Sequence, residues 1–163
     1  MNILTVILPL VLVGAQNEMS KTHPDEFAVA PYEQSNANAG ADPIDNAAVL
    51  AAFGGKEGID RLVENFSDRI IADPRIEGIF RARDDVRFRR TLKEHFCYLL
   101  GAGCDYTGMD MERAHVDHGI TEAEFNAVVQ NLQLAMNDAG IPFRMQNKFL
   151  AVLAPMQRSI VTR

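Results

Sequence analysis

The sequence has no tryptophan, only two cysteines and few aromatic residues, and it has no excess of positive charge. Two cysteines, Cys97 and Cys104, are too few for a disulfide-framed mini-protein or a thiolate zinc site. In the 163 residues, 16 Lys and Arg are outnumbered by 22 Asp and Glu, which gives a formal net charge of −6. This balance argues against a nucleic-acid-binding protein, which needs basic side chains to displace phosphate counterions. With 47% hydrophobic residues, the composition predicts one acidic domain with a buried core.

The N-terminal residues allow two interpretations of where the protein works. Residues 3–15 form an uncharged apolar run, shorter than the roughly 20 residues of a membrane-spanning helix. The run and the small residues Val13, Gly14 and Ala15 are typical of a signal peptide, which predicts a periplasmic or secreted protein. However, no Lys or Arg precedes the run, and Met19 begins a stretch typical of a cytoplasmic start. Residues 1–18 are therefore either a signal peptide or a mis-assigned extension, and we expect no membrane span in the mature domain.

Beyond these residues the chain divides into an arm and a helical domain. Residues 19–45 are rich in Asn, Ala, Pro, Ser and Asp without an apolar period, which predicts a disordered arm or linker. Residues 46–163 are predicted to form the folded domain, because their apolar residues recur at helical spacing and no segment alternates as a strand does. The apolar stretches run from Ile59 to Ile71, Phe88 to Leu100, Phe125 to Met136 and Pro142 to Ile160. The predicted fold class is all-α.

Two further signals concern the long segment between Gly101 and Thr121. A single helical turn is expected in it, near Met111 to His115, and long irregular segments of compact domains are more often functional than not. Thr121 and Glu124 then form a predicted capping box, in which each side chain bonds the other residue's backbone N–H and so starts a helix.

The histidines are the candidate residues for chemistry, since no HExxH, CxxC or Walker motif occurs. His23 lies in the arm. His115 and His118 are close in sequence, but a zinc ion needs three or four ligands and no others are near. A single neutral imidazole on a short turn facing a flat apolar pocket can instead hold haem iron, although an apolar stripe at helical spacing is more often simply core. Cys97 is interpreted as a small core residue, not a catalytic partner of His95.

Several short motifs occur in a fixed order between Asn46 and Ile160. They are Phe53-Gly54-Gly55, the stretch from Arg61 to Arg75, Phe80, Leu99-Leu100-Gly101-Ala102-Gly103 with Tyr106-Thr107-Gly108, Met111-Glu112-Arg113-Ala114-His115 with Gly119-Ile120-Thr121 and Phe125, and Ala154-Pro155. Together they resemble the group I truncated haemoglobins, in which two helices pack over two around a haem. The spacing from His115 to Gly119-Ile120-Thr121 is specific to that family. The resemblance implies an all-α, truncated globin-like two-over-two helical sandwich and a haem (protoporphyrin IX iron) cofactor.

The resemblance also implies roles for individual residues. His115 would be the proximal iron ligand, and Phe80 would lie against the porphyrin. Phe88, Leu92 and Phe96 would cover the distal side of the haem. His118 is expected to be either a solvated loop residue or a neighbour of a haem propionate, and His95 either lines a tunnel or faces solvent.

The implied function is reversible binding of a diatomic gas, O2, CO or NO, at haem iron. Three alternatives remain open at this point. One is a haem-based electron-transfer or gas-sensing protein. Another is an NO dioxygenase served by a reductase, or a peroxidase-like side activity, so that enzyme activity stays undecided. The third is a haem-free helical interaction domain, against which the presence of His115 and Phe80 argues.

The sequence departs from the family on the distal side. Ser67 stands where the family usually has a tyrosine, and Leu92 stands where a glutamine is common. In the family, the tyrosine and the glutamine donate hydrogen bonds to bound O2. Their replacement by Ser67 and Leu92 predicts an unusually apolar distal pocket with weaker O2 retention. Thr91 and Ser67 remain as weak candidate donors, and Arg90 or Lys93 could supply a donor from elsewhere on the helix.

Overall fold

The computed structural model describes residues 23–163, so the apolar run of residues 3–15 lies outside the described residues. This part of the chain is built from helices and contains no β-strand, as the apolar periodicity predicted. The helices are η1 (Asn36–Ala39), α1 (Ala47–Ala52), α2 (Gly55–Ala72), α3 (Glu77–Phe80), α4 (Asp85–Leu99), α5 (Met111–His115), η2 (Val116–His118), α6 (Glu122–Asp138), α7 (Phe143–Leu153), η3 (Ala154–Met156) and α8 (Gln157–Ile160), where η marks a 3-10 helix.

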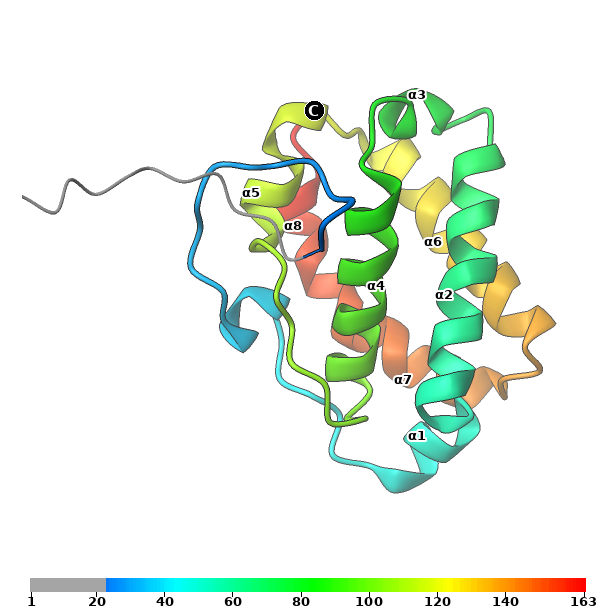
Figure 1. Ribbon diagram of the computed structural model, residues 1–163. Coiled ribbons are helices and arrows are strands. Elements are labelled where there is room, and N and C mark those ends of the chain that lie inside the picture. Colours follow the sequence, from blue (N-terminus) through cyan, green and yellow to red (C-terminus); the bar gives the residue numbers. More distant parts are fainter. Residues whose placement is uncertain (1–22) are drawn as a thin grey trace, which may run out of the picture.

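The helices α2 and α4 lie side by side, with α6 and α7 behind them (Figure 1). Phe66 of α2 stacks on Phe96 of α4 at 5.9 Å between ring centroids, and Phe96 meets the ring of Phe149 in α7 edge-on at 4.9 Å. All three rings are buried. Aromatic pairs of this kind contribute about 0.5–1.5 kcal/mol beyond the area they bury, so this cluster holds the two layers together.

The start of α2 depends on glycine. Gly54 and Gly55 have φ angles of +76° and +63°, a left-handed backbone that side chains with a Cβ disfavour. One turn later, a Cβ at Gly58 would lie 2.0 Å from the carbonyl oxygen of Phe53. The glycines thus allow α1 to turn tightly and pack against α2.

The capping box at the start of α6 is confirmed. The Thr121 hydroxyl accepts a 3.3 Å hydrogen bond from the Glu124 N–H, and the Glu124 carboxylate accepts one of 2.8 Å from the Thr121 N–H. The last apolar stretch, in contrast, is not one helix: α7 ends at Leu153, and η3 separates it from α8. Pro155 causes the break, because it has no N–H and restricts the backbone of the residue before it.

Residues 23–45 differ from the disordered arm that their composition predicted. The side chains of Glu26 and Ala39 are buried, and the Ile44 N–H donates to the Leu99 carbonyl at 2.8 Å. The segment passes the first half of α4 and later runs beside the loop that comes after this helix (Figure 1, blue to cyan). Its order comes from polar contacts with distant parts of the chain, which the sequence pattern of the segment itself does not reveal.

The two cysteines form a disulfide that the sequence interpretation missed. Cys97 in the last turns of α4 is bonded to Cys104 in the following loop, with 5.7 Å between their Cα atoms. Cys97 is buried, as predicted for a core residue, but its sulfur is not free. Gly101 and Gly103, at φ angles of +71° and +80°, let the chain reverse so that the sulfurs meet.

Candidate functional site

His115 is the last residue of the short helix α5. Asp110 begins this helix, since its carboxylate accepts a 2.8 Å hydrogen bond from the Arg113 N–H. The His115 Nδ1 atom lies 2.6 Å from the Met111 carbonyl oxygen. A carbonyl oxygen only accepts hydrogen bonds, so Nδ1 carries the proton and Nε2 presents a lone pair. This is the arrangement that orients a histidine for binding a metal through Nε2.

Burial favours the neutral form of the His115 imidazole. Removal from water lowers the pKa of this side chain; the bond to Met111 opposes that effect, and the nearby His118 reinforces it. His118 itself is exposed in η2. Among residues 23–163 no cluster of three or more His, Cys, Asp or Glu side chains is arranged to hold a metal ion.

Two of the predicted haem contacts come together in the structure. Phe80 at the end of α3 and Phe88 in α4 have ring centroids 5.5 Å apart, and both rings are half-buried. Leu92 follows Phe88 by one turn on α4 and is also half-buried. All three side chains pack against the hydrophobic core on one side while leaving apolar surface uncovered.

Phe96, the fourth predicted contact from this group, is placed differently. Its ring is only 3% exposed and lies among the core aromatic residues Phe66 and Phe149. Further apolar side chains share the half-buried state of Phe80 and Phe88, and helical spacing alone did not distinguish them from core residues. They are Ile79, Met111, Val128, Met145, Leu150, Val152, Leu153 and Ile160, from helices α3 and α5 to α8.

Ser67 is the polar residue on the predicted distal side, next to Phe66 on α2. Its side chain is completely buried, and its Oγ has no hydrogen-bond partner in the described part of the chain. A buried hydroxyl without a partner is costly, so it marks a place where a further group is expected to bind.

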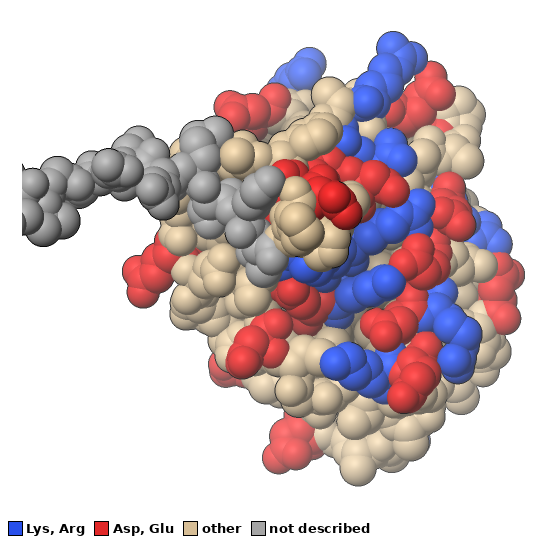
Figure 2. Space-filling model, in the orientation of Figure 1, with Lys and Arg blue, Asp and Glu red and all other residues tan. Residues whose placement is uncertain are grey.

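The other candidate distal donors are engaged elsewhere. The Thr91 hydroxyl donates to the carbonyl of Arg87 at 2.9 Å, one turn back on α4. Lys93 pairs with Glu64 of α2 at 2.5 Å, and Arg90 contacts the carboxylate of Glu94 at 2.7 Å. These pairs belong to an outer face over α4 and α2 on which acidic and basic side chains alternate (Figure 2).

His95 faces the interior, so the expectation of a solvent-facing side chain is wrong. Its Nε2 lies 2.8 Å from the Ala39 carbonyl oxygen, and its ring is 5.1 Å from the ring of Tyr106. Burial lowers the pKa of His95, the Ala39 bond opposes that effect, and the nearby His115 adds to it. His95 therefore ties α4 to the N-terminal segment.

In residues 23–163 no helix has both the length and the apolar character needed to cross a bilayer.

Comparisons with known proteins agree on one family. The profile of the bacterial-like globins matches residues 48–162. A group 1 truncated haemoglobin of Mycolicibacterium paratuberculosis is 33% identical over 116 residues, which cover 71% of this chain and 85% of the relative. One from a Synechocystis species is 30% identical over 94 residues, covering 55% of this chain and 76% of that protein.

Solved structures show the same fold. The truncated haemoglobin of Tetrahymena pyriformis in its Fe(III) form superposes with a TM-score of 0.67 at 21% identity, covering 71% of this chain and 98% of that one. The 2/2 haemoglobin of a Synechococcus species, with covalently attached haem, gives 0.65 at 22% identity over 71% and 98% of the chains. The helical architecture, the family profile and the sequence identity together place this chain in the bacterial-like globin family, among the group 1 truncated haemoglobins.

Proposed function

We propose that the protein binds haem through His115 and reversibly binds a diatomic gas on the opposite side of the cofactor. The orientation of His115 is the observation that carries this proposal. Its Nδ1 is held by Met111, its pKa is lowered, and its Nε2 is left to coordinate iron. Bound haem would supply the iron at which the gas binds.

The apolar residues of the site fit such a cofactor. A porphyrin is flat and largely apolar, and the half-buried rings of Phe80 and Phe88 offer it surface that the core leaves uncovered. Leu92 extends this surface along α4. These side chains would exclude water and hold the cofactor, while His115 would fix its position.

We further propose that the distal side is unusually apolar. The argument is by elimination among the residues named above. Thr91 donates to the Arg87 carbonyl. Lys93 pairs with Glu64, and Arg90 pairs with Glu94. The Nε2 of His95 donates to the Ala39 carbonyl. Leu92 has no donor, so Ser67 is the one candidate whose hydroxyl lacks a partner among the described residues.

The expected consequence is weaker retention of O2 than a distal tyrosine and glutamine would give. O2 gains more from a hydrogen-bond donor than CO does, because it carries more negative charge when bound to ferrous haem. The pocket should therefore favour CO or NO relative to O2. Gas storage, gas sensing and electron transfer would all use the same haem and the same His115. Dioxygenation of NO would need bound O2 to be retained, which an apolar distal pocket disfavours.

Absorption spectroscopy tests the proposal directly. Haem titrated into the purified protein should saturate at one haem per chain and give a strong Soret band. That band should shift on reduction and shift again when CO is added. The proposal would be disproved if the protein took up no haem, or if CO did not shift the Soret band of the reduced protein.

A further inference from the structure

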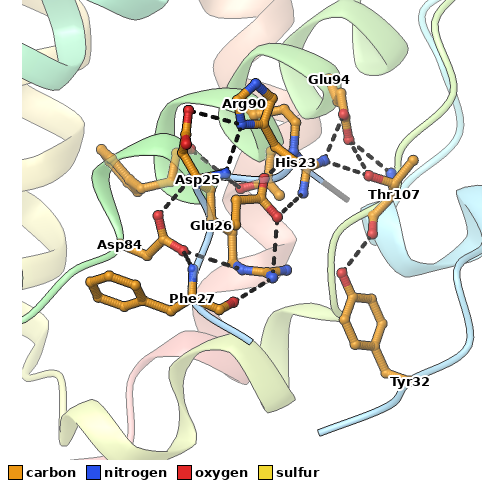
Figure 3. Close-up of polar contacts among 12 residues, drawn as sticks. His23, Asp25, Glu26, Phe27, Tyr32, Asp84, Arg90, Glu94 and Thr107 are labelled. Carbon is orange, nitrogen blue, oxygen red and sulfur yellow. Dashed lines mark hydrogen bonds and ion pairs between the residues drawn. The ribbon is translucent and has the colours of Figure 1, made fainter. Parts of the chain in front are cut away.

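The carboxylate of Glu26 is fully buried between two arginines of α4. Its oxygens lie 3.1 Å from the Arg87 Nη2 and 2.5 Å from the Arg90 Nε (Figure 3). A carboxylate taken out of water is costly unless charged donors surround it, so the two guanidinium groups stabilise Glu26 in this buried position. The contact spans more than sixty residues of sequence.

The next residue is held by its backbone. The Phe27 N–H donates to the Asp84 carboxylate at 2.6 Å, and the Phe27 carbonyl accepts from Arg87 at 3.0 Å. The Phe27 side chain is 63% exposed, so the chain is fixed here by charged groups and not by apolar burial. Glu26 and Phe27 together fasten the chain to the first half of α4.

A few residues later the same segment reaches α5. The Pro31 carbonyl accepts a 3.2 Å hydrogen bond from Arg113, whose guanidinium also lies 5.9 Å from the centre of the Tyr32 ring. The Tyr32 hydroxyl donates to the Thr107 carbonyl at 2.9 Å. Arg113 precedes His115 by two residues, so this end of the segment is fastened beside the proposed iron ligand.

We propose that residues 26–32 form a strap that closes one edge of the haem site and slows the release of haem. The strap joins α4, which carries Phe88 and Leu92, to α5, which carries His115 (Figure 1). Haem can leave only when these two walls separate, and the strap links them. Glu26 is a positioning residue in this device: it touches no cofactor but holds the strap on α4. The inference rests on the proposed function.

The charged network extends the effect of Glu26 beyond the strap. Arg90 also contacts Glu94 and the Thr107 hydroxyl, at 2.7 and 2.6 Å, and the Glu94 carboxylate accepts the Thr107 N–H at 3.0 Å. Thr107 in turn receives the Tyr32 hydroxyl. Removing the Glu26 charge therefore loosens both fastened ends of the strap.

The test compares Glu26→Gln with Glu33→Gln in the full chain. Glu33 is an exposed carboxylate on the same segment, and within residues 23–163 its side chain has no hydrogen bond or ion pair. Two rates are measured: transfer of haem to excess apomyoglobin, and chymotryptic cleavage after Phe27 in the haem-free protein. We expect Glu26→Gln to accelerate both by about tenfold and Glu33→Gln to leave both unchanged.

A core variant separates the strap from general stability. Ile59→Val removes one methylene from a fully buried side chain of α2, outside the strap. Urea unfolding of each variant then shows whether haem release follows overall stability.

Two outcomes overturn the proposal. In the first, Glu26→Gln releases haem at the wild-type rate, whether or not cleavage accelerates. In the second, Ile59→Val releases haem as fast as Glu26→Gln does for the same loss of stability. If the wild-type protein takes up no haem, the proposed function fails and the proposal fails with it, while the cleavage assay still reports whether Glu26 fastens the strap.

Discussion

The carboxylate of Asp73, at the end of α2, accepts a 2.6 Å hydrogen bond from the side-chain amide of Asn131 in α6. Arg75 donates to the same carboxylate from its backbone and its guanidinium. These bonds hold the pKa of Asp73 well below its ordinary value of 3.8. The largest contribution comes from Arg75 and the second largest from Asn131. Asp73 thus joins the two layers through its charged form.

The first prediction follows from the sign of that shift. Because folding lowers the pKa of Asp73, its stabilising effect is complete above the ordinary value and is lost as the pH falls below it. Asp73→Asn should lower the urea midpoint at about pH 6 but reduce the further loss on going to about pH 3. Asp42→Asn, a change of an exposed aspartate, is the matched control. Parallel pH profiles for all three proteins would refute the assignment.

The second prediction concerns the proximal ligand. His115→Ala should weaken haem affinity by more than about a hundredfold, since even loss of a group that merely orients a metal ligand costs 10–100-fold. His118→Ala, three positions later and exposed, should leave haem uptake unchanged. Soret absorbance during haem titration measures both, and added imidazole should restore binding to His115→Ala. Undisturbed uptake by His115→Ala would show that another residue binds the iron.

The third prediction concerns O2 retention. Leu92→Gln adds a donor on the predicted distal face of α4 and should slow O2 dissociation by about tenfold, as one hydrogen bond to a charged group would. Leu92→Met has similar size without a donor, so it should leave the rate near that of the wild type. Stopped-flow replacement of O2 by CO gives these rates. The apolar pocket is disproved if wild-type O2 dissociation is already slow and neither Ser67→Ala nor His95→Ala changes it.

The fourth prediction concerns the disulfide between Cys97 and Cys104. Its short loop restricts the unfolded chain, so Cys104→Ser should lower the free energy of unfolding by about 2–3 kcal/mol. A reductant should destabilise the wild-type protein to a similar extent and leave Cys104→Ser unaffected. Urea unfolding with and without dithiothreitol measures this. Equal stability of the wild-type protein with and without dithiothreitol would disprove the stabilising role of this bond.

The sequence was most informative where one helix face is buried. The apolar stretches beginning at Ile59, Phe88 and Phe125 correspond to α2, α4 and α6, because a helix that buries one face must repeat apolar residues at its own period. The His115 motif also predicted the α5 turn. Its hydrogen bond to Met111 then follows from helix geometry, since the carbonyl of residue i−4 lies beneath the side chain.

The sequence was least informative where order depends on distant polar partners. Glu26 is fixed by Arg87 and Arg90, and Ala39 by His95, over separations that no local pattern records. Phe96 shows a second limit of the pattern. It shares the helical stripe of Phe88 and Leu92, but the facing ring of Phe66 makes it part of the core. Which apolar residues face a cofactor is decided by the neighbouring helices.

The N-terminal segment bears on how this protein should be produced. The family profile begins at residue 48, and a shortened chain cut there would lack Glu26, Tyr32 and Ala39. Arg87 would lose one of its anionic partners, and His95 would lose the carbonyl to which it donates. We therefore expect the purified fragment to be less soluble and to lose haem faster than the longer chain. Expression plasmids should therefore encode the residues upstream of the globin boundary.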